Sequence, residues 1–559
     1  MKTIEMVFPK LNHFWLDSGL LGLTVILKEV DNNIEITIND MGLTLKGTEA
    51  EIQNALKKTY DLLVKRYYDL STKKQRDDTI SYNFYYDSKE NKFIAFPKKK
   101  SAGIAELIYN KAPRPTGGSI TWEKKEKREV LINNKTVKRT RGTLPSSHAH
   151  LQKRLDEFLD THGLDVTTSG LLIDGPNMVQ PNVTIPNNFF STKKGQCYLC
   201  GEESPVLEDA GQTIFPFITG SSGLLNFNTL CGKPEKICWK CAFTGKFAPV
   251  NGFYLSQGDN LFAFFPYSVS FEKMLDVYKP LQDAKYEDPN LFKNFKHPLG
   301  FEKYEDGYFQ KPFEVAFAFF YTLYRKVLLH QQEDKDDNIL NWEEMCNLTI
   351  SRAPLEFVVL HAESKGQTSM GKMVWHFRDS VYFFRLIEHI EKSEINIKEV
   401  MRLLIDFSQK NDNRTLIRNM VCERILKKQP ILDLIETHIF RAEITYIKPI
   451  FDFSIKYEPI IRKEGSYMTI DAQEAAVTLG KRIGMTIAEN GKKGDLFALR
   501  KARRKTDFLN ELNRLQFKCG LVVPPEIYEG KLTDENFIEF KQFCMIAALN
   551  SFYAKTQSK

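Results

Sequence analysis

Long hydrophobic stretches and secretory features are missing from this sequence. No run approaches the 18 apolar residues that suggest a transmembrane helix. The first residues, 1–6, contain no long apolar core and carry an early glutamate, so they do not resemble a secretory signal. Only nine cysteines occur in 559 residues, too few for a disulfide framework. These absences predict a cytoplasmic protein without a membrane segment.

Common catalytic motifs are also missing. The chain has no phosphate-binding Gly-x-x-x-x-Gly-Lys-Ser/Thr loop, no Gly-x-Gly-x-x-Gly, no His-Glu-x-x-His and no Gly-x-Ser-x-Gly. His148 and His150 could bind a metal only from a strand, because residues i and i+2 point about 200° apart on a helix. Ser146 and Ser147 before them favour a helix N-terminus. We therefore expect no enzyme, with a metal-dependent nuclease at these histidines as the minor alternative.

What the chain does contain is two Cys-x-x-C pairs, Cys197/Cys200 and Cys238/Cys241. Two such pairs supply the four thiolates of a tetrahedral zinc site, which has no open position and is structural. The segment between the pairs is longer than in a short zinc ribbon and includes Cys231, which could compete as a ligand. Two unrelated reduced pairs, or one redox pair, are the alternatives. Trp239 and Tyr198 are expected to pack the ribbon.

Basic residues are concentrated in residues 111–141, with a run of three lysines just upstream at 98–100, and in residues 481–518; an acidic stretch at 332–345 lies between the two regions. Two separated basic regions suggest a phosphate backbone that passes two domains, although each could be only a solvated face. The expected nucleic-acid-binding residues are Lys98, Lys99, Lys100, Arg114, Lys124, Lys125, Asn133, Asn134, Lys135, Lys138, Arg139, Arg141, Lys492, Lys493, Arg500, Lys501, Arg503, Arg504 and Lys505.

The pattern of elements predicts an α+β multidomain protein. Residues 1–190 form a mixed α/β domain, with strands over 1–45 (including the apolar run 19–27), a helix over 49–70, strands over 80–97 and a helix over 148–162. A zinc ribbon follows at 191–255. Residues 256–455 are expected to be mostly helical, with an apolar core helix at 313–330, a strand near 357 and four later helices. Residues 456–559 are expected to form a separate helical bundle with helices at 471–489, 495–516 and near 533–553.

The sequence resembles a known protein family. The order of a basic α/β region, a Cys-x-x-C pair insertion and a basic helical tail is similar to the CRISPR-associated large subunit of type I Cascade complexes, of the I-A/I-B kind. The strings at 195–201 and 495–503 carry most of the resemblance. Only the cysteine pairs form a transferable motif, since this family diverges widely.

The resemblance implies a non-catalytic subunit of a crRNA-guided antiviral surveillance complex. Such a subunit reads the protospacer-adjacent motif, stabilises the R-loop and docks an effector helicase–nuclease. Its implied partners are crRNA, target double-stranded DNA and its displaced strand, the backbone and handle-binding subunits, and a small subunit. Zinc is its implied structural cofactor. The alternative is a zinc-ribbon nucleic-acid-binding scaffold of another RNA-processing or defence system.

Overall fold

The computed structural model describes most of the chain, and the statements below concern that part. The described residues are 3–63, 83–95, 114–115, 118–132, 135–166, 170–174, 176–177, 184–211, 214, 235–257, 259–275, 309–324, 356–365, 368–410, 413–442, 444–462 and 466–557. The chain separates into two compact units. The first comprises Met1–Asp283 with Ala353–His376, and the second comprises Ala284–Arg352 with Phe377–Lys559. The predicted α+β class is confirmed.

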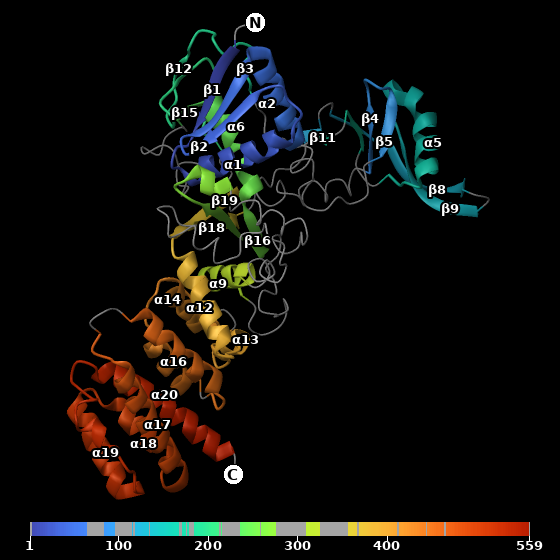
Figure 1. Cartoon of the computed structure of the whole chain (residues 1–559). Coiled ribbons are helices and arrows are strands. Elements are labelled where there is room, and N and C mark those ends of the chain that lie inside the picture. Colours follow the sequence, from blue (N-terminus) through green and yellow to red (C-terminus); the bar gives the residue numbers. More distant parts are fainter. Residues whose placement is uncertain are drawn as a thin grey trace. The chain divides into compact units, whose positions relative to one another are not determined.

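The N-terminal part of the first unit is a three-stranded antiparallel sheet with two helices (Figure 1). Strand β3 (Gly42–Thr48) lies between β1 (Thr3–Pro9) and β2 (Glu35–Asn39). Helix α2 (Glu49–Leu63) begins where the sequence predicts, and it buries the apolar stripe of an amphipathic helix. The end of that prediction, beyond residue 63, lies outside the described residues.

Helix α1 (Phe14–Glu29) corrects the prediction that residues 1–45 form only strands. Nearly all of its side chains are buried, so it lacks the polar stripe that marks a surface helix. Its backbone packs closely against residues of the cysteine module. A Cβ atom on Gly19 would lie 2.2 Å from the carbonyl oxygen of Thr244, and one on Gly22 would lie 2.5 Å from that of Phe247. The two glycines therefore mark a close backbone contact.

A four-stranded sheet completes the core of this part of the first unit. Its order is β16 (Phe253–Gln257), β17 (Asn260–Tyr267), β18 (Glu356–Lys365) and β19 (Thr368–Phe377). Residues of β17 and β18 belong to the same buried cluster as β1, α1 and α2. Only the strand near residue 357 is expected from the sequence, so the region 256–455 contains more strand than predicted.

The cysteine module consists of short strands and one short helix. It comprises β12 (Gly195–Gln196), β13 (Glu203–Ser204), β14 (Leu207–Asp209), β15 (Lys236–Cys238), α6 (Trp239–Gly245) and the 3-10 helix η4 (Ala248–Asn251). Strands β12 and β13 form one antiparallel pair, and β14 and β15 form another. Most of the predicted inserted loop, including Cys231, lies outside the described residues.

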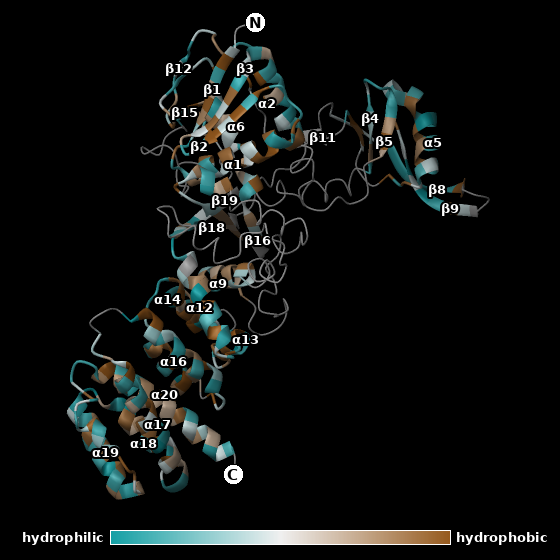
Figure 2. Cartoon of the chain, in the orientation of Figure 1, coloured by the Kyte–Doolittle hydropathy of each residue, from teal (hydrophilic) through white to brown (hydrophobic). Residues whose placement is uncertain are grey.

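A separate small core lies between these segments in the sequence. Its sheet has the order β5 (Lys92–Ala95), β4 (Phe84–Asp87), β10 (Gly170–Ile173) and β7 (Ser119–Thr121), which confirms the strands predicted at 80–97. Helix α5 (Gln152–His162) packs Leu155 and Leu159 into this core, while much of its surface is hydrophilic (Figure 2).

Two further strand pairs and a 3-10 helix accompany the small core. Strands β8 (Lys124–Ile132) and β9 (Lys135–Thr143) form a long antiparallel hairpin, and β6 (Arg114–Pro115) pairs with β11 (Pro176–Asn177). The 3-10 helix η2 (Ser146–Leu151) precedes α5, so the predicted helix at 148–162 starts as a tighter turn. In Figure 1 the hairpin extends away from β4, β5 and α5.

The second unit is helical in its described part. Its helices up to residue 461 are α9 (Pro312–Leu323), α12 (Ser380–Lys392), α13 (Ile397–Leu403), α14 (Leu416–Leu426), α15 (Leu432–Arg441) and α16 (Lys448–Ile461). Helix α9 is buried from residue 314 onward, which confirms its prediction as a core helix. Across the described chain, every helix is too short or too polar to cross a membrane.

The C-terminal helices differ from the prediction in two places. The structure has α17 (Ile470–Asn490), α18 (Lys493–Lys501), α19 (Lys505–Cys519), the 3-10 helix η7 (Pro525–Ile527) and α20 (Phe537–Gln557). The single helix predicted at 495–516 is broken, because Ala502 is extended and Asp507 caps a new helix through the amide of Arg504. The short helices predicted near 533–553 are instead the one long helix α20.

Candidate metal centre and basic surfaces

The first cysteine pair lies in the turn between β12 and β13. The amide of Gly201 donates to the carbonyl of Cys197 at 3.0 Å, and the amide of Cys197 donates to the carbonyl of Glu202 at 2.8 Å. Gly201 has a φ of +75°, a conformation that favours glycine. This tight turn carries the side chains of Cys197 and Cys200 toward the second pair.

The second cysteine pair lies where β15 becomes α6. Cys238 is the N-cap of α6, and its Sγ accepts a hydrogen bond from the amide of Cys241 at 3.4 Å. An N–H donor to sulfur stabilises a thiolate. A helix start therefore places both thiols of this pair on the same side of the turn.

The four sulfur atoms converge. The Sγ atoms of Cys197 and Cys241 are 3.8 Å apart, those of Cys200 and Cys238 are 3.6 Å apart, and all four lie within 4.8 Å of one another. A tetrahedral ion with metal–sulfur bonds of about 2.3 Å separates its sulfur ligands by about 3.8 Å. The cysteines thus form a cluster that could bind one metal ion, as predicted.

The protonation of the cluster reflects the crowding of its thiols. Hydrogen bonding from Cys200 and the other thiols lowers the pKa of Cys197, whereas the same contacts, first of all with Cys197, raise the pKa of Cys241. Four neighbouring sulfurs cannot all ionise without a cation between them. A bound metal ion would remove this conflict, because each thiol could then be a thiolate.

The cluster is part of the core of the first unit. Trp239 stacks on Phe189 with ring centroids 5.4 Å apart and meets the edge of Phe8 from β1 at 6.1 Å. Lys240 forms an ion pair with Glu202 and donates to the carbonyl of Val7, also in β1, at 2.9 Å. The predicted packing role of Trp239 is therefore confirmed. The cysteine module is fastened to the N-terminal sheet.

Tyr198 and the histidine pair behave differently from the cluster. Tyr198 was expected to pack inside the ribbon, but its side chain is half exposed. His148 and His150 lie on η2 with ring centroids 6.4 Å apart, and no cysteine, aspartate, glutamate or third histidine in the described chain completes a metal site with them. The cysteine cluster is accordingly the better candidate for a metal.

The first basic region divides between the two faces of the hairpin β8–β9. Alternation along the strands, together with the pairings Lys125–Gly142, Lys127–Thr140 and Glu129–Lys138, places Lys125, Lys127 and Lys138 on one face. All three lysines are exposed. Lys138 forms an ion pair with Glu129 at 4.0 Å.

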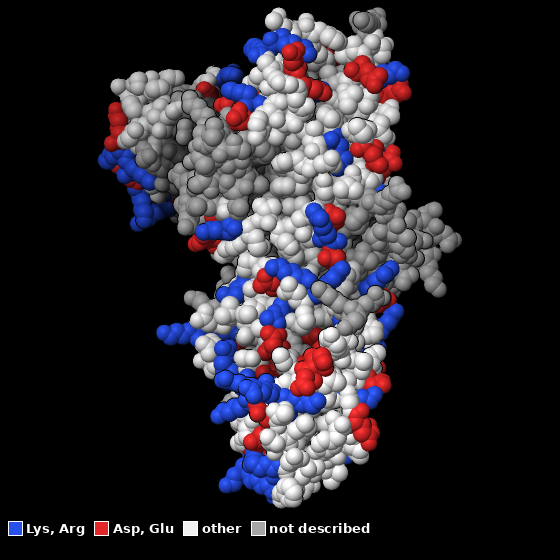
Figure 3. Space-filling model, turned by 90° about the vertical axis from the view of Figure 1, so that its left-hand side faces the viewer, with Lys and Arg blue, Asp and Glu red and all other residues white. Residues whose placement is uncertain are grey.

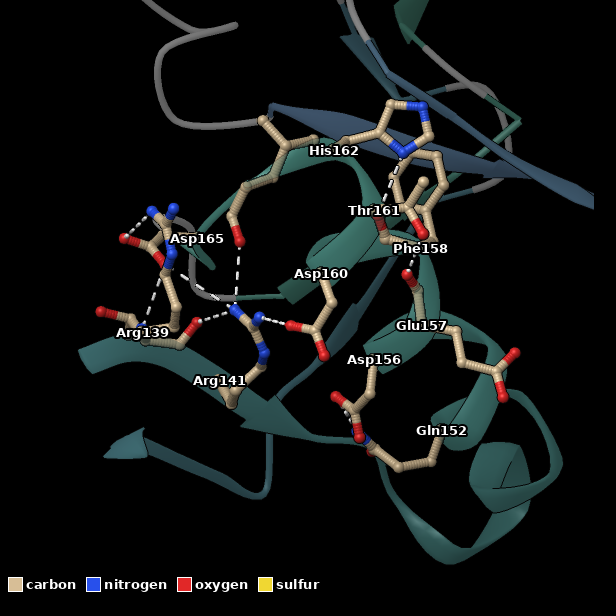
Figure 4. A network of polar contacts seen from close by, with 12 residues as sticks. Arg139, Arg141, Gln152, Asp156, Glu157, Phe158, Asp160, Thr161, His162 and Asp165 are labelled. Carbon is tan, nitrogen blue, oxygen red and sulfur yellow. Dashed lines mark hydrogen bonds and ion pairs between the residues drawn. The ribbon is translucent and has the colours of Figure 1, made fainter. Parts of the chain in front are cut away.

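The opposite face of the hairpin holds arginines that are engaged inside the domain (Figure 4). Arg141 is buried and forms ion pairs with Asp160 and, at 3.7 Å, Asp165, and it donates to the carbonyl of Leu164 at 3.0 Å. Arg139 lies 3.8 Å from Asp165. The prediction that Arg141 contacts nucleic acid must be corrected, because its guanidinium anchors the base of the hairpin.

Of the other residues predicted to bind nucleic acid in the first basic region, Lys124 alone has a described side chain. Lys124 is exposed and forms an ion pair of 2.6 Å with Glu126. Arg114 belongs to β6 and Lys135 to β9, but their side chains lie outside the described residues. Lys98, Lys99, Lys100, Asn133 and Asn134 also lie outside them, as does the acidic stretch 332–345.

The second basic region is also divided. Arg500 is half-buried, binds Glu436 at 2.7 Å and lies over the ring of Phe440, so it holds α18 against α15. Lys505 lies 3.7 Å from Asp534, and Lys493 lies over the ring of Tyr553. The exposed cations among the predicted residues are Lys492, Lys501, Arg503 and Arg504.

Two exposed apolar side chains were missed by reasoning from charge alone. Leu131 is 70% exposed near the end of β8, and Phe517 is 93% exposed on α19. For Phe517 a helical plot of residues 505–519 would have given a signal, because its position lies opposite the apolar stripe.

Comparison of the chain with protein-family models finds no match, and comparison with curated proteins finds no significant similarity. The features of the chain that bear on function are therefore the cysteine cluster and the placement of the charged and aromatic side chains. Of these, the cluster is the most specific chemically, and the hairpin holds a buried arginine on one face and exposed lysines on the other.

Proposed function

We propose that the four cysteines hold one structural zinc ion. The support is the sulfur separations of 3.6 and 3.8 Å, which match those of a tetrahedral four-thiolate zinc site. An ion with four protein ligands has no open position for water or substrate, so the proposed role is to join α6 to the turn at Cys197. Purified protein should contain one equivalent of zinc, and Cys241→Ser should lose it.

We further propose that the chain is the non-catalytic large subunit of a crRNA-guided surveillance complex that targets DNA. The observation that carries this proposal is the two-faced hairpin β8–β9. One face is anchored through Arg141, and the other presents Lys125, Lys127 and Lys138. A two-stranded ribbon fits the major groove of duplex DNA, and lysines along it can contact phosphates.

In this proposal the hairpin contacts the duplex next to the target and contributes to reading the protospacer-adjacent motif. The helical second unit supports the opened strands and offers a surface to the effector helicase–nuclease. The partners are crRNA, the backbone and handle-binding subunits and the small subunit, in the cytoplasm. This division agrees with guided recognition, in which base pairing reads the sequence and the protein supplies motif contacts and backbone charge.

The hairpin can be tested by salt-dependent binding to duplex DNA. Lys125→Gln, Lys127→Gln and Lys138→Gln together should weaken binding and reduce the slope of log K against log salt by up to about 2.7, since each phosphate contact contributes about 0.9. The matched control changes three lysines outside the hairpin, Lys392, Lys427 and Lys428 of the helical unit, and removes the same charge. Equal effects of the two triple variants would refute a specific role for the hairpin.

Co-purification tests the larger assembly. Tagged protein from its native cell should bring down a short guide RNA with repeat-derived ends and a multimeric backbone subunit. Recovery of other RNA without such a subunit would favour the alternative, a zinc-ribbon nucleic-acid-binding scaffold of an RNA-processing or other defence system. Recovery of no nucleic acid would contradict both.

A further inference from the structure

The outer face of α19 carries an unusual set of side chains. Thr506, Asn510, Asn513 and Phe517 follow one another at spacings of four, three and four residues, which places them on one face of the helix. All four are exposed. The apolar stripe of the helix, which includes Phe508 and Leu512, is buried against the rest of the bundle, so packing does not account for Phe517.

A second aromatic ring lies beside this face. Tyr528 is 52% exposed, and its hydroxyl donates to Oδ1 of Asn513 at 3.4 Å. Phe517 is one helical turn, about 6 Å, beyond Asn513 along the same face. Two exposed rings therefore lie near the neutral amide of Asn513, and none of the four positions of the face is charged.

Cations gather at the opposite end of the same helix. Lys501, Arg503 and Arg504 are exposed where α18 ends and α19 begins, and no ion pair to them is found within the described residues. Figure 3 shows Lys and Arg side chains along one side of the helical unit. Glu526 and Glu529 flank Tyr528 in the sequence, so the cationic end of the surface is the one at residues 501–504.

The acidic residues of α19 itself are engaged locally. Asp507 accepts from the amide of Arg504 at 3.2 Å, and Glu511 pairs with Arg514 at 2.7 Å. Arg514 and Lys518 also bind the buried carboxylate of Asp495, at 3.1 and 2.8 Å. Unlike Arg514 and Lys518, the cations Lys501, Arg503 and Arg504 at the start of α19 have no ion pair within the described residues and can bind an anionic partner.

We propose that this face of α19, with Tyr528, binds single-stranded nucleic acid by stacking bases on Phe517 and Tyr528. Sequence-tolerant single-strand sites combine aromatic rings with cations that follow the backbone, and this face has both. The amides of Asn510 and Asn513 lie between them and can bond base edges. A purely apolar protein partner fits less well, because the line between the rings and the cations is polar. The inference rests on the proposed nucleic-acid-binding function and assigns it a single-strand site.

The experiment measures anisotropy of two labelled oligonucleotides of equal length, oligo(dT) and an abasic strand, with the full-length protein. Phe517→Ala should weaken binding of oligo(dT) roughly five- to hundred-fold, the range measured for loss of one stacked base, and leave the abasic strand unchanged. Arg503→Gln with Arg504→Gln should weaken both strands and flatten the salt dependence. Phe190→Ala, at an exposed aromatic residue of the other unit, is the matched control.

The outcomes separate this inference from the function on which it rests. If Phe517→Ala and Tyr528→Ala leave oligo(dT) binding unchanged, or weaken the abasic strand equally, the stacking site is refuted while duplex binding by the hairpin can persist. If the wild-type chain binds neither single strands nor duplex, both proposals fail. If Phe517→Ala instead abolishes binding of a partner protein and spares oligo(dT), the surface is a protein-docking site and the inference is wrong.

Discussion

Removal of the metal is expected to unfold more of the chain than the segment that holds it. The sequence alone suggests that chelation loosens residues 191–255. The structure places α6 inside the core shared with β1 and α1, where Trp239 contacts Phe8 and the backbone of Thr244 lies against Gly19. The loss of the cluster should therefore spread into the N-terminal sheet.

The size of the effect follows from what α6 buries. Trp239 and Phe243 are both nearly inaccessible, and exposing each of two such rings costs about 2–3 kcal/mol. The sum, about 5 kcal/mol, equals the lower limit of the stability of a typical domain. Structural zinc itself contributes on the order of 10 kcal/mol in small zinc domains, so local repacking should not compensate for its removal.

Hydrogen exchange followed by mass spectrometry provides the measurement. With a chelator, or with Cys241→Ser, amides of Thr3–Pro9, Phe14–Glu29 and Trp239–Gly245 should lose protection together. The small core built on α5 has its own buried cluster and serves as an internal control, since its protection should persist.

A restricted response would refute this reasoning. If protection is lost only within 195–245 while β1 and α1 exchange as before, the module is energetically independent of the N-terminal sheet. Cys519→Ser is the matched variant, because it replaces a buried thiol outside the cluster. It should retain full zinc content and normal exchange in β1.

Three further predictions concern buried charges. Arg141→Leu should cost roughly 1.5–3 kcal/mol and increase proteolysis at the hairpin β8–β9, because the hydrogen bonds of its guanidinium to Asp160 and to the carbonyl of Leu164 are lost; unchanged proteolysis would contradict the anchoring role. In the folded protein, Arg418 forms an ion pair of 2.9 Å with Glu314, and both side chains are fully buried. Arg418→Ala removes the positive charge beside the buried carboxylate, so urea unfolding should show the helical unit to be less stable by about 3–5 kcal/mol. A loss of stability below about 1 kcal/mol would refute this prediction. Burial raises the pKa of Glu458 from 4.5 to about 7. Between these pH values the carboxyl group is protonated in the folded protein and ionised in the unfolded chain. The free energy of unfolding of the helical unit should therefore fall by up to about 3 kcal/mol as the pH rises from 4.5 to 7. Glu458→Gln should remove that pH dependence, and a slope that persists in this variant would show that another group causes it.

The fold was predictable where periodicity was clear. Helix α2 and the four helices between 380 and 441 agree with the sequence pattern. Helix α1 was misassigned because a helix buried on nearly all sides and a buried strand both appear as a continuous apolar run. Gly19 and Gly22 within that run allow the helix backbone to lie close to Thr244 and Phe247.

The candidate sites could likewise be predicted from the sequence only in part. The cysteine cluster could be predicted because two Cys-x-x-C turns define their own local geometry. The basic residues could not be sorted from sequence, since Arg141 and Lys138 are equally charged and only three positions apart. One is buried between Asp160 and Asp165, and the other is exposed on the opposite face of the hairpin. Counting charges does not distinguish a cation that stabilises the fold from one offered to a ligand.

The pairing of β17 with β18 has a consequence for the order in which the chain is made. Tyr267 pairs with Glu356, so a growing chain must add roughly 90 residues before β17 meets its neighbour, which takes on the order of 5–20 s at ordinary rates of translation. During that time the backbone edge of β17 and its apolar residues lack their partner, and such edges favour aggregation. The first unit therefore completes its central sheet only after residues assigned to the second have left the ribosome, which makes chaperone supply a determinant of soluble yield.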